Sequence, residues 1–570
     1  MAMRAATATQ VCSTEWISKS WNGQPAAGNS FDSALSSDGR HVAFESEAAN
    51  LVPGDSNGKN DIFVVDRFFH TVERVSVSSA GVQGNDHSLS PSMSGDGRYI
   101  TFVSKSTNLD PLDTHPAYDV YLHDRQAKTT QLISIHIKPQ VTTFWASAQP
   151  RISPDGRFVL FHHGEDNIVP GNANGTGDVF LRDMSTGVTE LVSVSSAGLQ
   201  SDGQSYGGVM SADARYVAFL SEANNWYPGN STVVPRPCPY IRDRVSGTTL
   251  PVNPTNMLTL CGASDGLSMS VDGRFLAYTF GNCAASDLTP LWLAHVFVRD
   301  MLTGVSVPVS HSTFAIPTLP KPSLLPSGRP SISADGRFIT FQSYDDDLVL
   351  NSGNTGGINV FVHDRLTGLT QCASLGPAGQ WPSIPFQWYA EAFRPAISAD
   401  GRHISFSCED PSFGSGNALY NIYVRTCDWT QPAVYCAAQT NSLGCVPSIS
   451  SAGSPSASVG SGFTVGVKRL ISSTYGVFFY STRRPLLAPF QGGYLCMELP
   501  IRRLALMPTG GSTSPDCTGG LQVDFNAWIA SGADPSLVAG ENVCIQAWSR
   551  DAGAVTTTNL SNALVFAIGP

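Results

Sequence analysis

The sequence predicts an all-β protein: a seven-bladed β-propeller closed by an N-terminal strand and followed by a small C-terminal β-sandwich. Three observations carry this prediction. The pattern S-x-D-G-R-x-x-x-F, or a close variant of it, occurs seven times in the 570 residues. Each copy is followed by further short segments with strand composition. The chain contains 53 Gly and 37 Pro but only 14% charged residues, which is typical of many short strands joined by turns.

The repeat sets the expected blades. Its aspartates, 58 to 65 residues apart, are Asp38, Asp96, Asp155, Asp213, Asp272, Asp335 and Asp400. Each copy holds four strand-like segments, two around the motif, a third such as DIFVVDR and a fourth such as TERVSV. A four-stranded sheet of this kind cannot bury both of its faces alone and has to stack on its neighbours.

Charged side chains recur at the ends of the predicted strands. An Arg ends the first hairpin of each copy and an Asp ends most third strands, so we expect both on one rim, where they can form ion pairs. The residues given this structural role are Asp38, Arg40, Asp66, Arg98, Asp124, Arg157 and Asp183. The Gly of D-G-R is expected in a left-handed conformation, which Ala214 would adopt with some strain.

The N-terminal segment is expected to complete the last blade. Residues 12–20 align with the fourth strand of a copy, whereas the seventh copy supplies only three strands. Closure of the ring removes exposed sheet edges. Cys12 would then lie near Cys427 or Cys436, and the sequence leaves the choice between them open.

The repeat disappears after about residue 430. The expected division is 1–11 as a leader, 12–430 as the propeller, 431–445 as a Cys-containing linker and 446–570 as a β-sandwich with strands such as YGVFFYST and NVCIQAWSRD.

Composition limits the location and the partners of the chain. Its 12 Cys include no C-x-x-C pair, which favours disulfides and a secreted, periplasmic or cell-surface location. No segment has the roughly 20 apolar residues of a membrane helix. The net charge of -11, with no basic run longer than two residues, speaks against a nucleic-acid partner.

The S-x-D-G-R-x-x-x-F repeat resembles the TolB-like, WD40-like (PD40) β-propeller repeat over residues 12–430. This resemblance implies the fold and assigns no catalytic residue, because similar blades occur in binding proteins, peptidase lids and polysaccharide lyases. The C-terminal segment resembles cysteine-bearing modules that are appended to secreted bacterial proteins.

The stretch VPGDSNGKNDIF has the spacing of a calcium loop. Asp55, Asn57 and Asp61 supply side-chain oxygens, and Lys59 a backbone oxygen. The third copy repeats the spacing with Asn172, Asn174 and Asp178. Calcium is the predicted cofactor, and a turn shaped only by Asx and Gly residues is the alternative.

Aromatic residues gather in the long connections expected on one rim. They are Trp145, Trp226, Trp381, Trp388 and Tyr389. Such rings can stack on a glycan, or they can simply pack the loops. His162 and His163 stand where other copies have E-S, V-S or Q-S, and they are either a site or a structural pair.

The sequence contains neither an H-E-x-x-H motif nor a P-loop, and no catalytic residue is assigned. We therefore expect an exported, non-enzymatic binding or scaffold protein, stabilised by calcium, that contacts a glycan, a cell surface or a protein through its rim loops and C-terminal domain. One alternative is a carbohydrate-active enzyme, a polysaccharide lyase or hydrolase, with its site on the loop-rich rim. A second is a self-assembling extracellular subunit, and the choice between monomer and polymer stays open.

Overall fold

The structure is a computed structural model. It describes residues 12–113, 116–137, 148–164, 168–226, 237–252, 260–261, 266–282, 294–310, 327–345, 348–349, 358–382, 394–428, 432–436, 438–483 and 485–570. No helix among them is long and apolar enough to cross a bilayer.

The first four copies of the repeat each form a four-stranded antiparallel sheet with its strands in chain order. The first sheet contains β2 (Ser30–Leu35), β3 (His41–Ser46), β4 (Asp61–Asp66) and β5 (Thr71–Arg74). The second contains β6 (Ser88–Met93), β7 (Tyr99–Ser104), β8 (Asp119–Asp124) and β9 (Thr129–Leu132). The third contains β10 (Ala148–Ile152), β11 (Phe158–His163), β12 (Asp178–Asp183) and β13 (Val188–Leu191). The fourth contains β14 (Ser205–Met210), β15 (Tyr216–Ser221), β16 (Cys238–Asp243) and β17 (Thr248–Pro251).

The remaining copies form three further sheets. The fifth contains β18 (Leu260–Cys261), β19 (Leu267–Met269), β20 (Phe275–Asn282), β21 (Ala294–Asp300) and β22 (Val305–Pro308). The sixth contains β23 (Ser327–Ile332), β24 (Phe338–Ser343), β25 (Asn359–Asp364) and β26 (Leu369–Cys372). The last contains β27 (Ala396–Ile397), β28 (His403–Cys408), β29 (Asn421–Cys427) and, from the start of the chain, β1 (Cys12–Trp16). A single 3-10 turn, η1 (Pro411–Phe413), joins β28 to β29.

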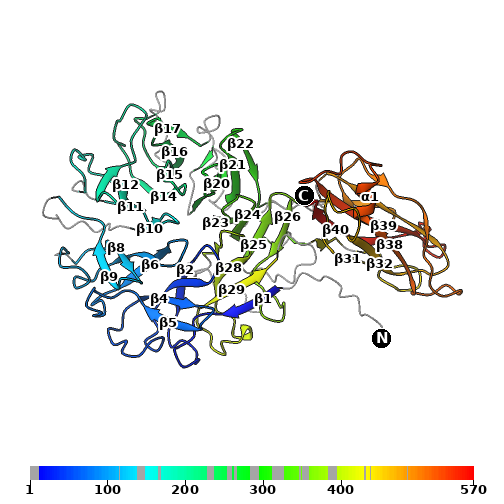
Figure 1. Cartoon of the computed structure of the whole chain (residues 1–570), viewed down its shortest axis with the longest axis horizontal. Helices are drawn as coiled ribbons and strands as arrows, with labels where there is room; N and C mark the ends of the chain where they lie inside the picture. Colours follow the sequence, from blue (N-terminus) through cyan, green and yellow to red (C-terminus); the bar gives the residue numbers. More distant parts are fainter. Residues whose placement is uncertain are drawn as a thin grey trace.

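These sheets stand in a ring, in the order of the chain (Figure 1). The first strand of each sheet contacts the first strand of the next, from β2 to β6 and onward until β27 contacts β2 again. The faces pack against one another: Ala43 and Val64 of the first sheet share a core with Phe102 of the second. This arrangement is a β-propeller, as the repeat predicts.

The last sheet takes its outer strand from the N-terminal end of the described chain. β1 is antiparallel to β29, with Cys12 opposite Cys427 and Trp16 opposite Tyr423. A disulfide joins Cys12 to Cys427, one of the two partners that the sequence leaves open. Ile17, just after β1, is 3% exposed and packs with residues of the first and last sheets.

The recurring Arg and Asp side chains meet on the rim that carries the D-G-R hairpins. Arg40 Nη2 lies 2.6 Å from Asp66 Oδ2, and Arg40 lowers the pKa of Asp66 to about 2. Equivalent ion pairs join Arg98 to Asp124, Arg157 to Asp183, Arg215 to Asp243, Arg274 to Asp300 and Arg337 to Asp364. Asp38 accepts hydrogen bonds from Ser36 Oγ and from the Arg40 amide, and Ala214 has a φ of 52° at the position of the repeat Gly.

The C-terminal strands form a separate set of sheets. The largest contains β30 (Ala433–Tyr435), β33 (Tyr475–Ser481), β36 (Arg502–Arg503), β37 (Met507–Pro508), β39 (Asn542–Arg550) and β40 (Thr558–Ala567). A second contains β31 (Ser448–Ala452), β32 (Thr464–Leu470) and β38 (Gly519–Asp524), and a hairpin contains β34 (Pro485–Phe490) and β35 (Gly493–Met497). Val465 and Val467 of β32 share a buried core with Phe478 of β33 and Phe566 of β40, so the two larger sheets face each other.

Two features of this region differ from the sequence analysis. The strand expected at LQVDFN ends at Asp524, whose side chain accepts from the Ala527 amide and caps the helix α1 (Phe525–Ala530). β30 lies within the segment expected to be a linker and pairs with β40. Disulfides join Cys436 to Cys496 and Cys445 to Cys517.

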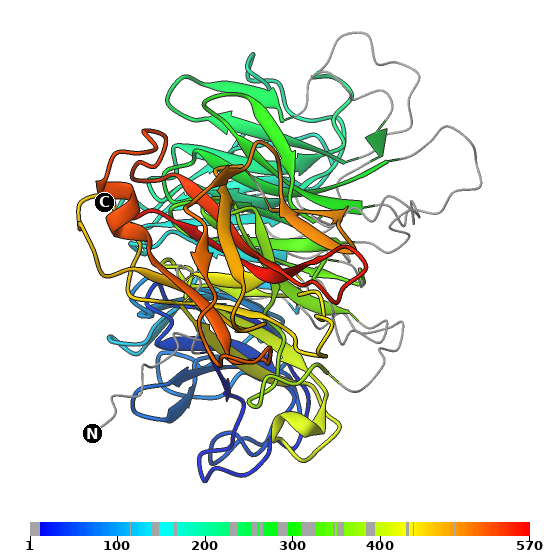
Figure 2. The same ribbon diagram turned by 90° about the vertical axis from the view of Figure 1, so that its right-hand side faces the viewer.

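The C-terminal sheets lie against the propeller near its sixth sheet. Leu369 of β26 is 5% exposed and belongs to the same core as Tyr435 and Leu495. Figure 2, seen from this side, shows the C-terminal strands in front of the repeat sheets.

Candidate active site

The first strands of five repeat sheets share a backbone irregularity. Their pairing with the second strand shifts between Phe31 and Ala34, and at the same place in the copies that contain β6, β10, β14 and β23. Each shift is a β-bulge, a device that re-aims a side chain. In these five copies the bulge contains the residue six positions before the repeat Asp. The residues at this position in the seven copies are Asp32, Ser90, Gln149, Gly207, Gly266, Arg329 and Arg394.

Left-handed backbone marks these bulges. The φ angle is 40° at Asp32, 56° at Gln149 and 52° at Arg329. Non-glycine residues seldom adopt such angles, and they concentrate where a site needs them. The strain therefore sets the direction of the side chains around the axis of the ring.

The bulges border two adjoining cavities, which we call the channel pocket. One, of about 300 Å³, is lined by residues of all seven first strands, including Asp32, Arg151 and Arg394. The other, of about 160 Å³, is lined by Gln149, Arg151, His162, Tyr206, Arg329 and Arg394. Because every repeat sheet contributes, the channel pocket lies on the axis of the ring.

Positive charge dominates the channel pocket. Arg394 Nη1 lies 2.9 Å from Asp32 Oδ2, whereas Arg151 and Arg329 add two further guanidinium groups to the lining. Burial and the neighbouring Arg394 lower the pKa of Arg151. An anion would relieve this accumulation of positive charge.

Two groups near the channel pocket have shifted pKa values: His162 lines the pocket, and Glu45 contacts the backbone of the lining residue Ser90. Glu45 and His162 occupy the same place in the first and third copies, seven residues after the repeat Asp. Glu45 is 8% exposed and its Oε2 accepts from the Ser90 amide at 2.8 Å. Burial, with the charge of Asp32, raises the pKa of Glu45 to about 8.

His162 is the second of these groups. Burial lowers the pKa of His162 to about 4, so its imidazole is neutral at pH 7. Its ring centroid lies 6.5 Å from that of Tyr206. The lining of the channel pocket thus combines guanidinium groups with a neutral imidazole and a phenol, which are groups that stabilise charge and transfer protons.

In the predicted calcium loop of the first copy, the side-chain oxygens that would bind calcium accept hydrogen bonds from other groups of the protein. Asp55 Oδ1 and Asp61 Oδ2 both accept from Gln83 Nε2, at 2.8 and 3.0 Å. Asn57 Nδ2 donates to Asp61 Oδ2, while Asn57 Oδ1 accepts from the Lys59 amide. Arg74 Nη1 lies 3.4 Å from Asp55 Oδ1 and 3.7 Å from Asp61 Oδ2, so a guanidinium already stands beside both carboxylates.

The corresponding loop of the third copy contains similar hydrogen bonds. Asn174 Nδ2 donates to Asp178 Oδ2 at 2.8 Å and to Ser201 O at 3.0 Å. Asp178 Oδ1 accepts from Ser193 Oγ, and Asn172 is 6% exposed. Calcium at either loop stays a prediction.

The predicted glycan-stacking aromatics are only partly described. Trp145, Trp388 and Tyr389 lie outside the described residues. Trp226 meets Phe219 and Tyr240 edge-on, and its indole donates to Leu199 O. Trp381 packs against the core of the fifth and sixth sheets. Their role in binding a glycan stays a prediction.

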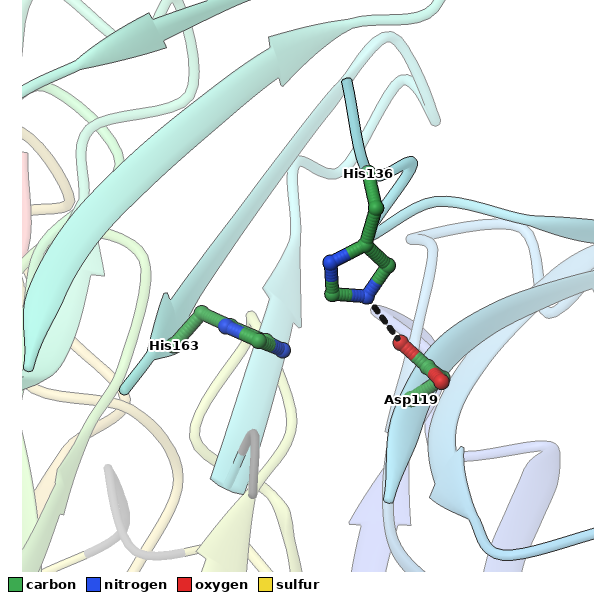
Figure 3. A group of neighbouring side chains, drawn as sticks. All are labelled: Asp119, His136 and His163. Atoms are coloured by element: carbon green, nitrogen blue, oxygen red, sulfur yellow. Dashed lines mark hydrogen bonds and ion pairs between the residues drawn. The ribbon is translucent and has the colours of Figure 1, made fainter. Parts of the chain in front are cut away.

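A different group of side chains has the character of a metal centre. Asp119 of β8, His136 after β9 and His163 of β11 place one ligand atom each within 4.8 Å of the other two (Figure 3). The sequence points to His163 but not to its partners, because Asp119 and His136 belong to the preceding copy. Figure 3 shows the three side chains turned toward a common point from separate elements.

Sequence reasoning missed most of the channel pocket. Asp32, Glu45, Arg151, Tyr206, Arg329 and Arg394 were not among the predicted site residues. The sequence signal for this pocket is the position six residues before each repeat Asp. The residue there changes from Asp to Ser, Gln, Gly or Arg, whereas the motif that follows it hardly changes.

Several solved structures are similar to this chain. No family model matches the chain, and no curated protein matches it. An oligogalacturonate lyase in complex with manganese is 11% identical with a TM-score of 0.45, over 74% of this chain and 95% of the other. The acylaminoacyl peptidase of Pyrococcus horikoshii is 11% identical with a TM-score of 0.41, over 81% and 60%. A protein assigned as TolB from Agrobacterium tumefaciens is 15% identical with a TM-score of 0.32, over 53% and 88%.

These comparisons correct the main functional expectation. A non-enzymatic binding or scaffold protein was expected, and this was wrong: the similar structures include a lyase and a peptidase. At such identities and TM-scores the similarity does not assign an activity, so the chemistry has to be argued from the channel pocket. The chain is similar in structure to enzymes and TolB-like proteins of the β-propeller fold.

Proposed function

We propose that the chain is an exported carbohydrate-active enzyme, a seven-bladed propeller with a C-terminal β-sandwich, that cleaves an acidic polysaccharide in the channel pocket. The observation that carries the proposal is the convergence of Arg151, Arg329 and Arg394 with His162 and Tyr206 around one cavity. Three disulfides support an origin in an oxidising compartment. The partner in this proposal is therefore a glycan.

A lyase reaction suits these groups best. A uronic acid bears its carboxylate next to a carbon-bound hydrogen, and neutralising that carboxylate makes the hydrogen more acidic. The arginines would stabilise the negative charge that develops, and the neutral His162 would accept the proton. The carbon–hydrogen electron pair becomes a double bond as the glycosidic carbon–oxygen bond breaks, and Tyr206 would protonate the departing oxygen. The step needs neither water nor an oxidant.

A hydrolase is the second candidate, because Asp32, which lines the channel pocket, and Glu45, which contacts the backbone of the lining residue Ser90, have contrasting environments. Asp32 is ion-paired with Arg394, whereas burial raises the pKa of Glu45 to about 8. A protonated and an ionised carboxyl group are the acid and base of glycoside hydrolysis. In this reaction Glu45 would donate the proton to the leaving oxygen.

The deciding experiment incubates the purified chain with uronic-acid polysaccharides and with neutral ones. A lyase should produce new reducing ends together with the ultraviolet absorbance of an unsaturated sugar, on the uronic-acid substrates only. A hydrolase should produce reducing ends without that absorbance. Neither product from any substrate would contradict the proposal.

Replacement of His162 by Gln should lower kcat on the substrate found in this way about 10²- to 10³-fold, because the proton acceptor is lost. The change is structurally mild, since the sixth copy carries Gln342 at this position. His70→Gln is the matched control, because His70 is 79% exposed at the β4–β5 turn. Equal activity of His162→Gln and the wild type would exclude His162 as the base.

Calcium at the loop of Asp55, Asn57 and Asp61 is a further proposal with a simple test. Binding would require calcium to displace Arg74 Nη1 from its place 3.4 Å from Asp55 Oδ1. The site would be weak, with a Kd of about 10⁻⁴ to 10⁻³ M. A melting temperature that rises with millimolar calcium and falls with excess chelator would support it, and an unchanged melting temperature would leave Arg74 as the cation of this loop.

A further inference from the structure

The cluster of Asp119, His136 and His163 lies at one end of the second and third sheets, outside the lining of the channel pocket. Asp119 and His163 are 1% exposed, and the side chain of His136 is 9% exposed. His136 Nε2 lies 3.2 Å from Asp119 Oδ1. The two imidazole rings meet nearly edge to face, with centroids 5.0 Å apart.

The internal repeat shows which of these residues the fold itself requires. Asp119 accepts from Ser134 Oγ at 2.6 Å, and the first and third copies contain the same bond between Ser76 and Asp61 and between Ser193 and Asp178. In the sixth copy the acceptor is Asn359. The carboxylate is therefore part of the scaffold, and it is held in place by a hydroxyl group.

The two histidines, in contrast, depart from the repeat. His163 stands where four other copies have a Ser that bonds to a Ser of the first strand, at Ser46, Ser104, Ser221 and Ser343. His136 stands two residues after the bonding Ser, where the neighbouring copies have Ser78 and Ser195.

The two departures meet at one place. The histidines come from different copies, yet both imidazoles replace a small hydroxyl side chain and both turn toward the same carboxylate (Figure 3). The fifth and seventh copies have Phe280 and Cys408 at the position of His163, so among the seven copies the third alone places an imidazole there. The convergence of two nitrogen ligands on an oriented oxygen ligand indicates a bound cation.

We propose that Asp119, His136 and His163 bind a divalent transition-metal ion of the zinc, cobalt or manganese class. Two imidazole nitrogens and one carboxylate oxygen suit such ions, whereas calcium and magnesium prefer oxygen ligands alone. Ligands of a tetrahedral ion lie about 3.3 Å apart, which matches the separation of His136 from Asp119. Three protein ligands leave a coordination position for water or a ligand.

The position of the metal relative to the channel pocket follows from the strand. His163 follows His162 on β11, and successive side chains of a strand point to opposite faces. His162 lines the channel pocket while His163 faces Asp119. The metal would hold the end of β11 on the face opposite to the channel pocket. This inference holds whether or not the channel pocket is a lyase site.

The test is metal binding by the full chain after treatment with chelator and dialysis. Titration with Zn²⁺ and with Co²⁺ should show one ion bound per chain, the visible absorption of four- or five-coordinate Co²⁺, and a raised melting temperature. Ca²⁺ should compete with neither ion.

Three variants introduce residues that other copies of the repeat already contain at the same positions. We therefore expect these variants to fold. His136→Ser and His163→Ser restore the serine of other copies, and Asp119→Asn keeps the bond to Ser134 as Asn359 does in the sixth copy. Each should weaken binding more than about 100-fold, beyond the loss typical of outer-shell substitutions. His70→Gln should bind as the wild type does. Absence of a stoichiometric ion, or equal affinity of the serine variants and the wild type, would overturn the proposal.

Discussion

A chain that begins at residue 21, and therefore lacks β1, should not fold into a stable propeller. Without β1 the last sheet loses its outer strand, and all of β29 becomes an exposed edge. The Cys12–Cys427 cross-link, which closes a loop of 415 residues, is lost as well. Ile17 no longer covers the core that joins the first and last sheets.

Near-ultraviolet circular dichroism and size-exclusion chromatography measure the outcome. We expect loss of the tertiary signal and association of the shortened chain through the open edge. The control is the full-length double variant Cys12→Ser/Cys427→Ser, which keeps β1 and should lose only the contribution of the cross-link, about 2–5 kcal/mol of unfolding free energy. A shortened chain that melts at the wild-type temperature as a monomer would show that β1 does not close the ring.

The stability of the protein should fall as the pH rises from 5 to 8, and Glu45 should account for much of the fall. The pKa of Glu45 is about 8 in the folded protein, and that of an unfolded Glu is about 4.3. Folding therefore favours the protonated form, and the stabilisation is complete below the unfolded pKa and is lost as the pH rises through the folded pKa. By linkage the loss between pH 5 and 8 is about 3 to 4 kcal/mol.

Glu45→Gln tests this directly, because the amide keeps an oxygen that accepts from the Ser90 amide but cannot ionise. Denaturant unfolding at pH 5 and pH 8 should show a fall smaller by about 3 to 4 kcal/mol in this variant than in the wild type. Glu47→Gln is the matched control, since Glu47 is exposed two residues further along the chain. Parallel pH profiles of wild type and Glu45→Gln would contradict a buried, protonated Glu45.

The fold was largely accessible to sequence reasoning because its information is local and repeated. Each D-G-R hairpin fixes the turn between two strands, and the aromatic six residues after the Asp, such as Phe44, fixes which face is buried. The missing fourth strand of the last copy pointed to residues 12–20. In the C-terminal region there is no repeat, and the helix that begins at Phe525 depends on the cap formed by Asp524.

The candidate site was much less accessible, for a physical reason. Arg151, Arg329 and Arg394 lie in different copies and meet only because seven first strands surround one axis. His136 and His163 likewise approach each other only through the stacking of adjacent sheets. A departure from the repeat can be seen in the sequence, whereas the point where several departures meet requires the ring.

The bulges around the axis make the channel pocket unusually easy to redesign. Each of the seven equivalent positions, five of which lie in a bulge, belongs to a different sheet, and consecutive ones are 58 to 65 residues apart in the chain. A substitution at Gln149, for example, leaves the aromatic core of its own sheet, Phe161 against Phe180, untouched. Changes at positions without shared partners should combine additively. Asp32 and Arg394 form an ion pair and have to be varied together, whereas the other positions can be varied one side chain at a time in a combinatorial library on a constant frame.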